Sequence, residues 1–171
     1  NEGTPLLLSV RSGGRISMPG MMDSILNIGL NDNNVQQLAE TFNDERFALD
    51  SYRRLIQMYS NVVLGVEHDR FEAVLANKKR LDNVASDADF NVEQLEWIIN
   101  AYKNTVERFT NAEFPQDPYE QLMGSIEAVF NSWQNKRAAT YRKINNIPEE
   151  WGTGATIQAM VFGNLNDKSG T

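Results

Sequence analysis

The residues best suited to chemistry lie together near the start of the chain, in the segment 9–23 (SVRSGGRISMPGMMD). Arginine offers a planar fork of N–H donors, serine adds a hydroxyl donor, and glycine lets the backbone approach a ligand closely. No acidic residue lies between Pro5 and Met22, although the whole chain carries a formal net charge of -7. This combination is suited to binding a phosphate group. A surface turn with incidental arginines is the alternative.

A second pair of cations, Arg53 and Arg54, lies within a stretch of helical periodicity. Neighbouring residues on a helix point about 100° apart, so only one of the two arginines can readily face a shared site. Asp50 precedes Arg54 by four residues, the spacing at which helical side chains pair. The alternative to a ligand-binding role is that these arginines are exposed and that Asp50 is their only partner.

The composition excludes several other kinds of chemistry. The chain has no cysteine and one histidine, His68, so it offers no disulfide, thiolate metal site or cysteine nucleophile. Its acidic balance argues against nonspecific nucleic-acid binding, and no apolar run approaches the ~20 residues of a membrane span. We therefore expect neither nucleic acid nor membrane as a partner, and a reducing cytoplasm as the compartment.

Three zones must position these residues. Residues 1–32 are read as strand and loop, 33–147 as a helical subdomain, and 148–171 as a turn followed by a strand over 156–163. The apolar run 6–8 predicts the first strand. The fold class is therefore α+β, mainly α, with strands from both chain ends. The first and last residues suggest a piece of a longer protein.

Helices are expected after Asp44, from about Asp69 to Ala76, after Asp89 or Asn91, from Pro115 or Pro118, and from about Ala138 to Asn145.

Several motifs, in order along the whole chain, resemble the N-terminal nucleotide-binding region of the pyruvate, phosphate dikinase family. They are SVRSG (9–13), SMPGMMD (17–23), NIGLND (27–32), DSYRR (50–54), FPQ (114–116), WGT (151–153), and Gln158 with MVFGN (160–164). The resemblance implies part of an ATP-grasp-like domain that binds ATP. The family converts ATP, pyruvate and phosphate to AMP, phosphoenolpyruvate and diphosphate by way of a phosphohistidine.

The resemblance also assigns roles to individual positions. Arg11 would contact the phosphates of ATP, with a weaker case for Ser12, and the backbone around Gly20 and Met21 would cover them. Arg54 corresponds to an arginine near the nucleotide site. The adenine ring would lie on the strand that carries three further residues, Gln158, Met160 and Val161.

Other parts of the family's machinery are expected outside this chain. They include the ligands of Mg²⁺, the phosphohistidine domain, which His68 does not match, and the barrel that binds pyruvate. The implied parent is a homodimer, and the chain alone is expected to be inactive and to bind ATP weakly. Two alternatives stay open: a related phosphoenolpyruvate synthase that uses water in place of phosphate, and a non-enzymatic helical interaction module.

Overall fold

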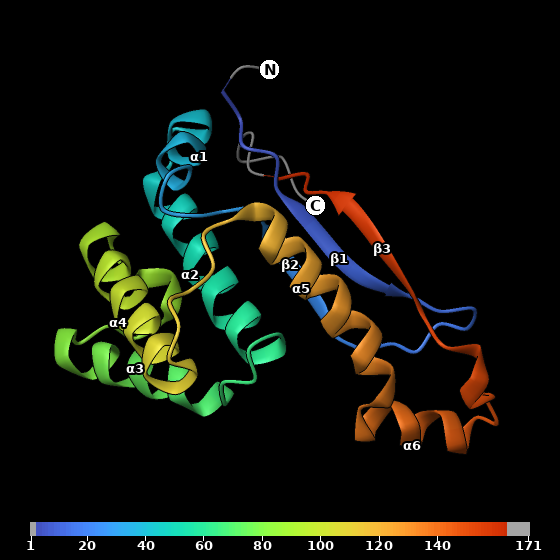
Figure 1. Cartoon of the computed structure of the whole chain (residues 1–171). Coiled ribbons are helices and arrows are strands. Elements are labelled where there is room, and N and C mark those ends of the chain that lie inside the picture. The colour runs from blue at the N-terminus through green and yellow to red at the C-terminus, as the bar shows by residue number, and fades with distance from the viewer. Residues whose placement is uncertain (1–2, 164–171) are drawn as a thin grey trace.

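The computed structural model describes residues 3–163 and places a three-stranded antiparallel sheet beside a set of helices (Figure 1). The strands are β1 (Leu8–Gly13), β2 (Ser24–Ile28) and β3 (Gly154–Ala159), in the order β2-β1-β3. β1 and β2 form a hairpin with a long loop, and β3 returns from the other end of the chain to pair with β1. The predicted fold class, mainly helical α+β with strands from both ends, is confirmed.

The helices fall into a larger group and two separate elements. In Figure 1, α1 to α4 gather on one side of the sheet, α5 runs along the strands, and α6 follows at the far end of α5. The six helices are α1 (Val35–Phe42), α2 (Glu45–Val62), α3 (His68–Asp82), α4 (Val92–Thr110), α5 (Pro118–Asn131) and α6 (Lys136–Ile144). Short 3₁₀ helices lie between α3 and α4 (η1, Asp87–Asp89), between α5 and α6 (η2, Ser132–Gln134) and between α6 and β3 (η3, Glu149–Trp151).

Local sequence explains where α2, α4 and α5 start. The Asp44 side chain accepts a hydrogen bond from the Phe47 N–H at 2.9 Å and caps α2 as expected. Asn91, rather than Asp89, caps α4, and Pro118 occupies the first turn of α5, where its missing N–H costs nothing. The third helix continues to Asp82, beyond its expected end, and Lys78 pairs with that residue at 2.7 Å.

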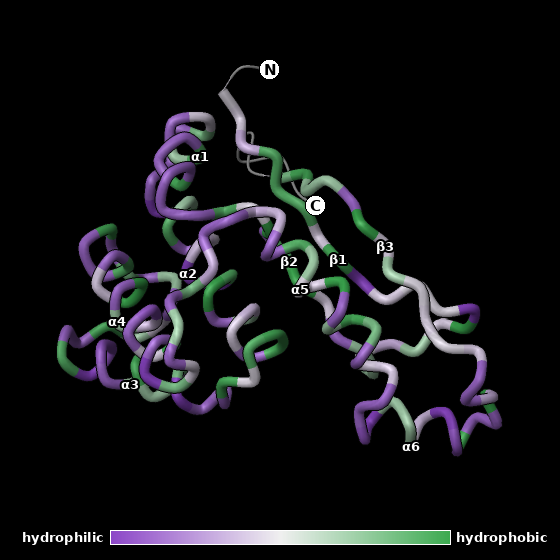
Figure 2. The backbone as a smooth tube through the Cα atoms, viewed as in Figure 1, coloured by the Kyte–Doolittle hydropathy of each residue, from purple (hydrophilic) through white to green (hydrophobic). Residues whose placement is uncertain are grey.

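One hydrophobic core joins the sheet to the helices. Val10 and Ile25 from the sheet, Tyr52 and Leu55 from α2, and Tyr102 from α4 are all at most 1% exposed. Figure 2 shows hydrophobic colour along the chain entering β1, whereas α1 and α6 are mostly hydrophilic. The core therefore fixes α2 against the sheet, and with it the position of the Arg53–Arg54 pair.

Three local expectations are corrected. Residues 9–13, expected to begin a loop, form strand β1, because β2 pairs with one of its edges and the distant β3 pairs with the other. β3 begins at Gly154 and ends at Ala159, so Met160 and Val161 follow the strand. Helical spacing predicts that Phe130 faces inward from α5 together with Leu122, Ile126 and Val129, but Phe130 is 48% exposed and the buried positions include Gln121. Gln121 is buried because its Oε1 accepts from the Gly29 N–H at 2.8 Å.

Candidate nucleotide-binding site

Arg11 lies on the face of the sheet that points away from α5. It is paired with Ser24 of β2 and Thr156 of β3, and directly opposed residues project to the same face. The neighbouring Val10 and its partner Ile25 project to the other face, where they are fully buried and α5 packs against the strands. Arg11 itself is exposed. Within residues 3–163 its guanidinium forms no hydrogen bond or ion pair, so it is free to bind an anion.

Ser12 does not share that face. Successive residues of a strand alternate between faces, and Ser12 is paired with Ala155 on the side of Val10. The structure therefore separates the Ser12 side chain from Arg11, although both belong to the same motif.

The chain reverses direction at residues 18–21. The Met21 N–H donates to the Met18 carbonyl at 3.1 Å, Pro19 holds the second position, and Gly20 has φ +71° in the third. Proline then glycine at these positions is the signature of a type II turn. Met21 uses its N–H within the turn, whereas the Gly20 N–H has no partner among the described residues. The backbone around Gly20 can therefore donate to a ligand.

The end of this loop is attached to α6. Asp23 accepts from the Asn135 side chain at 2.9 Å and forms an ion pair with Arg137, whose Nε also donates to the Met21 carbonyl at 3.0 Å. Met18 packs in a small buried cluster with Trp133, Ala138 and Ile147. A groove of about 770 Å³ lies between Met21 and α6. These anchors were missed from the sequence because they are more than 100 residues from the loop.

Replacing Arg137 with alanine should loosen the loop while leaving the fold intact. The side chain is 52% exposed, so its contacts contribute about 1 kcal/mol or less to the free energy of unfolding. We expect amide hydrogens of residues 18–22 to exchange about fivefold faster, measured by hydrogen exchange with mass spectrometry. Lys136→Ala, on the same helix, is the control and should leave these amides unchanged. Equal exchange in both variants would contradict the anchoring role.

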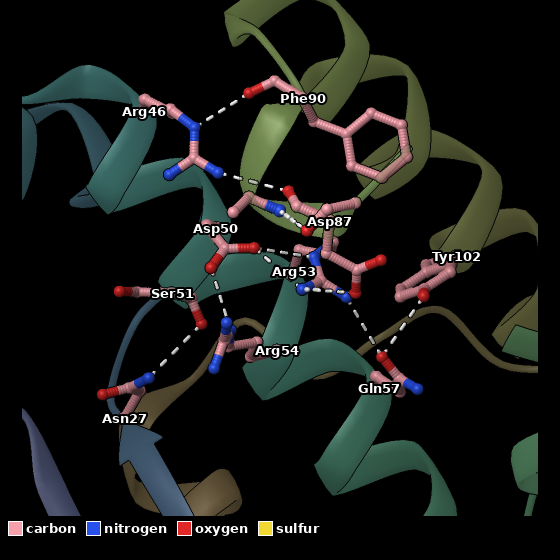
Figure 3. A network of polar contacts seen from close by, with 12 residues as sticks. Asn27, Arg46, Asp50, Ser51, Arg53, Arg54, Gln57, Asp87, Phe90 and Tyr102 are labelled. Atoms are coloured by element: carbon pink, nitrogen blue, oxygen red, sulfur yellow. Dashed lines mark hydrogen bonds and ion pairs between the residues drawn. The ribbon is translucent and has the colours of Figure 1, made fainter. Parts of the chain in front are cut away.

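The paired arginines of α2 have opposite environments (Figure 3). Arg53 is 3% exposed and donates from Nε to Asp50 Oδ1 at 2.9 Å and from Nη1 to Gln57 at 3.3 Å. Burial lowers its pKa, but the adjacent Asp50 carboxylate outweighs this and raises the pKa of Arg53 above its ordinary value. Arg54 is 62% exposed and donates from Nε to Asp50 Oδ2 at 2.8 Å. The predicted i, i+4 pair with Asp50 is confirmed, and one arginine alone remains open to solvent.

Asn27 ties α2 to the sheet near Arg54 (Figure 3). The register of β2 against β1 shifts by one residue between Leu8 and Val10, and Asn27, with φ +60°, lies in the corresponding part of β2. Such an extra residue is a β-bulge. The Asn27 side-chain amide donates to the Ser51 carbonyl of α2 at 3.4 Å. Through this contact the turn of α2 before Arg54 lies beside the sheet.

The expected adenine-binding residues lie on or just beyond β3. Gln158 is opposite Ser9 in the β1–β3 ladder and is exposed. The Met160 N–H donates to the Leu7 carbonyl at 2.8 Å, and the Val161 side chain is 76% exposed. β3 is an edge strand of the described sheet, so its outer backbone groups are available for pairing.

Comparison with known proteins decides the family. The family described as "Pyruvate phosphate dikinase, AMP/ATP-binding domain" matches residues 1–171. The chain belongs to this family. The dikinase motifs recognised in the sequence therefore lie in an ATP-grasp-like nucleotide-binding domain.

Individual dikinases match almost the whole chain. The pyruvate, phosphate dikinase of Rhizobium meliloti (strain 1021) is 53% identical over 167 residues, 98% of this chain and 19% of the relative. That of Clostridium symbiosum is 50% identical over 168 residues, also 98% and 19%. A chloroplastic dikinase of Mesembryanthemum crystallinum is 49% identical over 167 residues, 98% of the chain and 18% of the relative. The chain thus spans about one fifth of these dikinases.

Metal ligands are sparse in this part of the dikinase domain. Within residues 3–163, no group of three or more His, Cys, Asp or Glu side chains is arranged to hold a metal ion. His68 is exposed and lies 3.3 Å from Glu72. No helix in the same described range has the length and apolarity needed to span a membrane.

Proposed function

We propose that this chain forms one wall of the ATP site of a pyruvate, phosphate dikinase. The observation that carries the proposal is Arg11, which has no hydrogen-bond or ion-pair partner within residues 3–163 and is exposed on the sheet face away from α5, in a domain whose family is described as AMP/ATP-binding. Its guanidinium would bind phosphate oxygens, and the Gly20 backbone would donate to the same group. Phosphoryl transfer depends on such positioned donors, because negative charge spreads over several oxygens.

The other proposed contacts divide the nucleotide between two regions. Arg54 would contribute a second cation from α2. Gln158, Met160 and Val161 would hold the adenine ring through the backbone of the edge strand and the Met160 side chain. Ser12 has the weakest support, because its side chain lies on the other sheet face from Arg11. The segments 1–32, 33–147 and 148–171 would act as parts of one nucleotide-binding domain.

The proposed parent enzyme converts ATP, pyruvate and phosphate to AMP, phosphoenolpyruvate and diphosphate through a phosphohistidine. Its histidine domain, pyruvate-binding barrel and Mg²⁺ ligands would come from sequence outside this chain, and the parent would be a cytoplasmic homodimer. Identity of 49–53% to proteins named pyruvate, phosphate dikinase supports this enzyme over a water-dependent synthase and over a non-enzymatic helical module. A requirement of the parent for inorganic phosphate would distinguish the dikinase from the synthase.

The proposed site can be tested on the chain itself by nuclear magnetic resonance. Titration with Mg-ATP should shift the backbone amide signals of Arg11, Gly20 and Gln158, with a dissociation constant in the millimolar range, because the chain holds only part of the site. Inorganic triphosphate should shift Arg11 and Gly20 alone. Shifts confined to α3 and α4 would overturn the assignment, and micromolar affinity would contradict an incomplete site.

A further inference from the structure

One carboxylate on α2 joins the buried arginine to the exposed one (Figure 3). Asp50 Oδ1 accepts from Nε of Arg53 at 2.9 Å and lies 2.8 Å from its Nη2. The other oxygen, Oδ2, accepts from Nε of Arg54 at 2.8 Å. Asp50 is itself only 16% exposed. Both of its oxygens are therefore committed, each to a different arginine.

Arg53 fixes the carboxylate from the inside of the protein. Its guanidinium is enclosed by Asp50, Gln57 and Asp87, the last at 3.7 Å from Nη2. Tyr102 donates its hydroxyl to the same Gln57 oxygen at 3.2 Å, and Lys79 pairs with Asp87 at 2.5 Å. A buried side chain with this many polar partners has little rotational freedom. Asp50 is consequently held in one orientation before Arg54 reaches it.

Arg54 is held at one nitrogen and open at the others. Among the residues that the structure describes, its two terminal nitrogens have no partner. The guanidinium is planar, so a hydrogen bond at Nε sets the plane in which both terminal nitrogens lie. Arg53 and Arg54 carry two positive charges against the one negative charge of Asp50, and Lys79 offsets Asp87. The cluster therefore presents a fixed donor fork with a residual positive charge.

We propose that Asp50 is a positioning residue that holds the fork of Arg54 ready for a phosphate group. The proposal rests on the proposed function, in which Arg54 contacts a phosphate-bearing substrate. Holding a long side chain in place beforehand removes the entropy cost that it would otherwise incur on binding. The phosphate group belongs either to ATP or to the inorganic phosphate that the dikinase reaction consumes.

The test is a double-mutant cycle in the full-length dikinase that carries this segment. Asp50→Asn should raise the KM for Mg-ATP or for inorganic phosphate by about fivefold, which is the effect expected from losing one exposed charge-assisted contact. The kcat of the variant should stay within about twofold of the wild-type value. Measuring both KM values identifies the substrate. In an Arg54→Gln background, Asp50→Asn should change that KM by less than about 1.5-fold, because Asp50 is proposed to affect substrate binding only through Arg54.

Asp82→Asn is the matched control. Asp82 is 23% exposed and forms an i, i+4 pair with Lys78 at 2.7 Å on α3, without a contact to Asp50, Arg53 or Arg54. Its replacement should lower the melting temperature while leaving both KM values unchanged. If Asp50→Asn does not fold, Asp50→Glu serves in the same cycle, since its longer side chain displaces the carboxylate.

The outcomes separate the two hypotheses. No effect of Arg54→Gln on either KM would contradict the proposed role of Arg54 and so remove the basis of the inference. An effect of Arg54→Gln without one from Asp50→Asn would overturn the positioning role alone. Additive effects in the cycle would overturn it as well, because Asp50 would then act by another route.

Discussion

Replacing Arg11 with alanine in the full-length dikinase is expected to lower kcat/KM for Mg-ATP by about 100-fold, the usual loss when one donor to developing negative charge is removed. Arg11 forms no hydrogen bond or ion pair within residues 3–163, so its removal breaks nothing in the fold. Its neighbour Val10 holds the strand in the core at 0% exposure. The loss should therefore appear in steady-state kinetics and not in thermal unfolding.

Arg15→Ala provides the matched control for this prediction. Arg15 lies in the loop that follows β1, four residues after Arg11, and its guanidinium lies over the Trp151 ring at 4.7 Å from the ring centre. Its removal should change kcat/KM by less than about threefold, since a solvent-exposed cation–π contact is worth about 0.5–1 kcal/mol. Equal losses in the two variants would indicate that general positive charge in the loop, rather than the position of Arg11, governs nucleotide binding.

Arg142→Ala is expected to lower the free energy of unfolding of the chain by about 3 kcal/mol, from lost packing and a lost hydrogen bond. The Arg142 side chain is 1% exposed and donates from Nη1 to the Trp133 carbonyl. Its guanidinium also lies over the Trp133 ring at 4.2 Å. Trp133 packs with Met18 of the loop, so the variant should also lose order there. Denaturant unfolding would measure the free-energy change.

Arg142→Met separates packing from charge. The Nε of Arg142 is buried without a hydrogen-bond partner, so the charge is incompletely compensated in the folded state. Methionine retains most of the volume and removes this unsatisfied group, so the loss should be only about 1 kcal/mol. A loss as large as that of alanine would show that the hydrogen bond to Trp133, rather than packing, supplies the stability.

The sequence predicted those features that depend on neighbours along the chain. Asp44 and Pro118 marked helix starts because capping and the first helical turn involve residues two or three positions away. The Asp50–Arg54 pair followed from helical spacing. The motifs also identified the family, because they match in order from one end of the chain to the other.

Features that depend on distant partners could not be predicted in this way. The polar residues 9–13 pair as a strand only because β3, about 145 residues later, supplies the other edge. Gln121 is buried, against its polarity, because it satisfies the backbone of Gly29. The anchors of the loop, Asn135 and Arg137, have no local signal, since their contact with Asp23 is visible only in the folded chain.

The candidate phosphate-binding residues Arg11 and Arg54 show the same difference between local and distant determinants. The sequence by itself determined that Arg11 lies in an acid-free glycine-rich segment, and that Arg53 and Arg54 cannot both face one site. The tertiary structure decided which of the pair is buried, because Asp87 of η1 and the Gln57–Tyr102 contact to α4 lie at Arg53, whereas the Arg54 side chain is 62% exposed. It also decided that Arg11 faces away from α5, because the strand alternates and Val10 is required in the core.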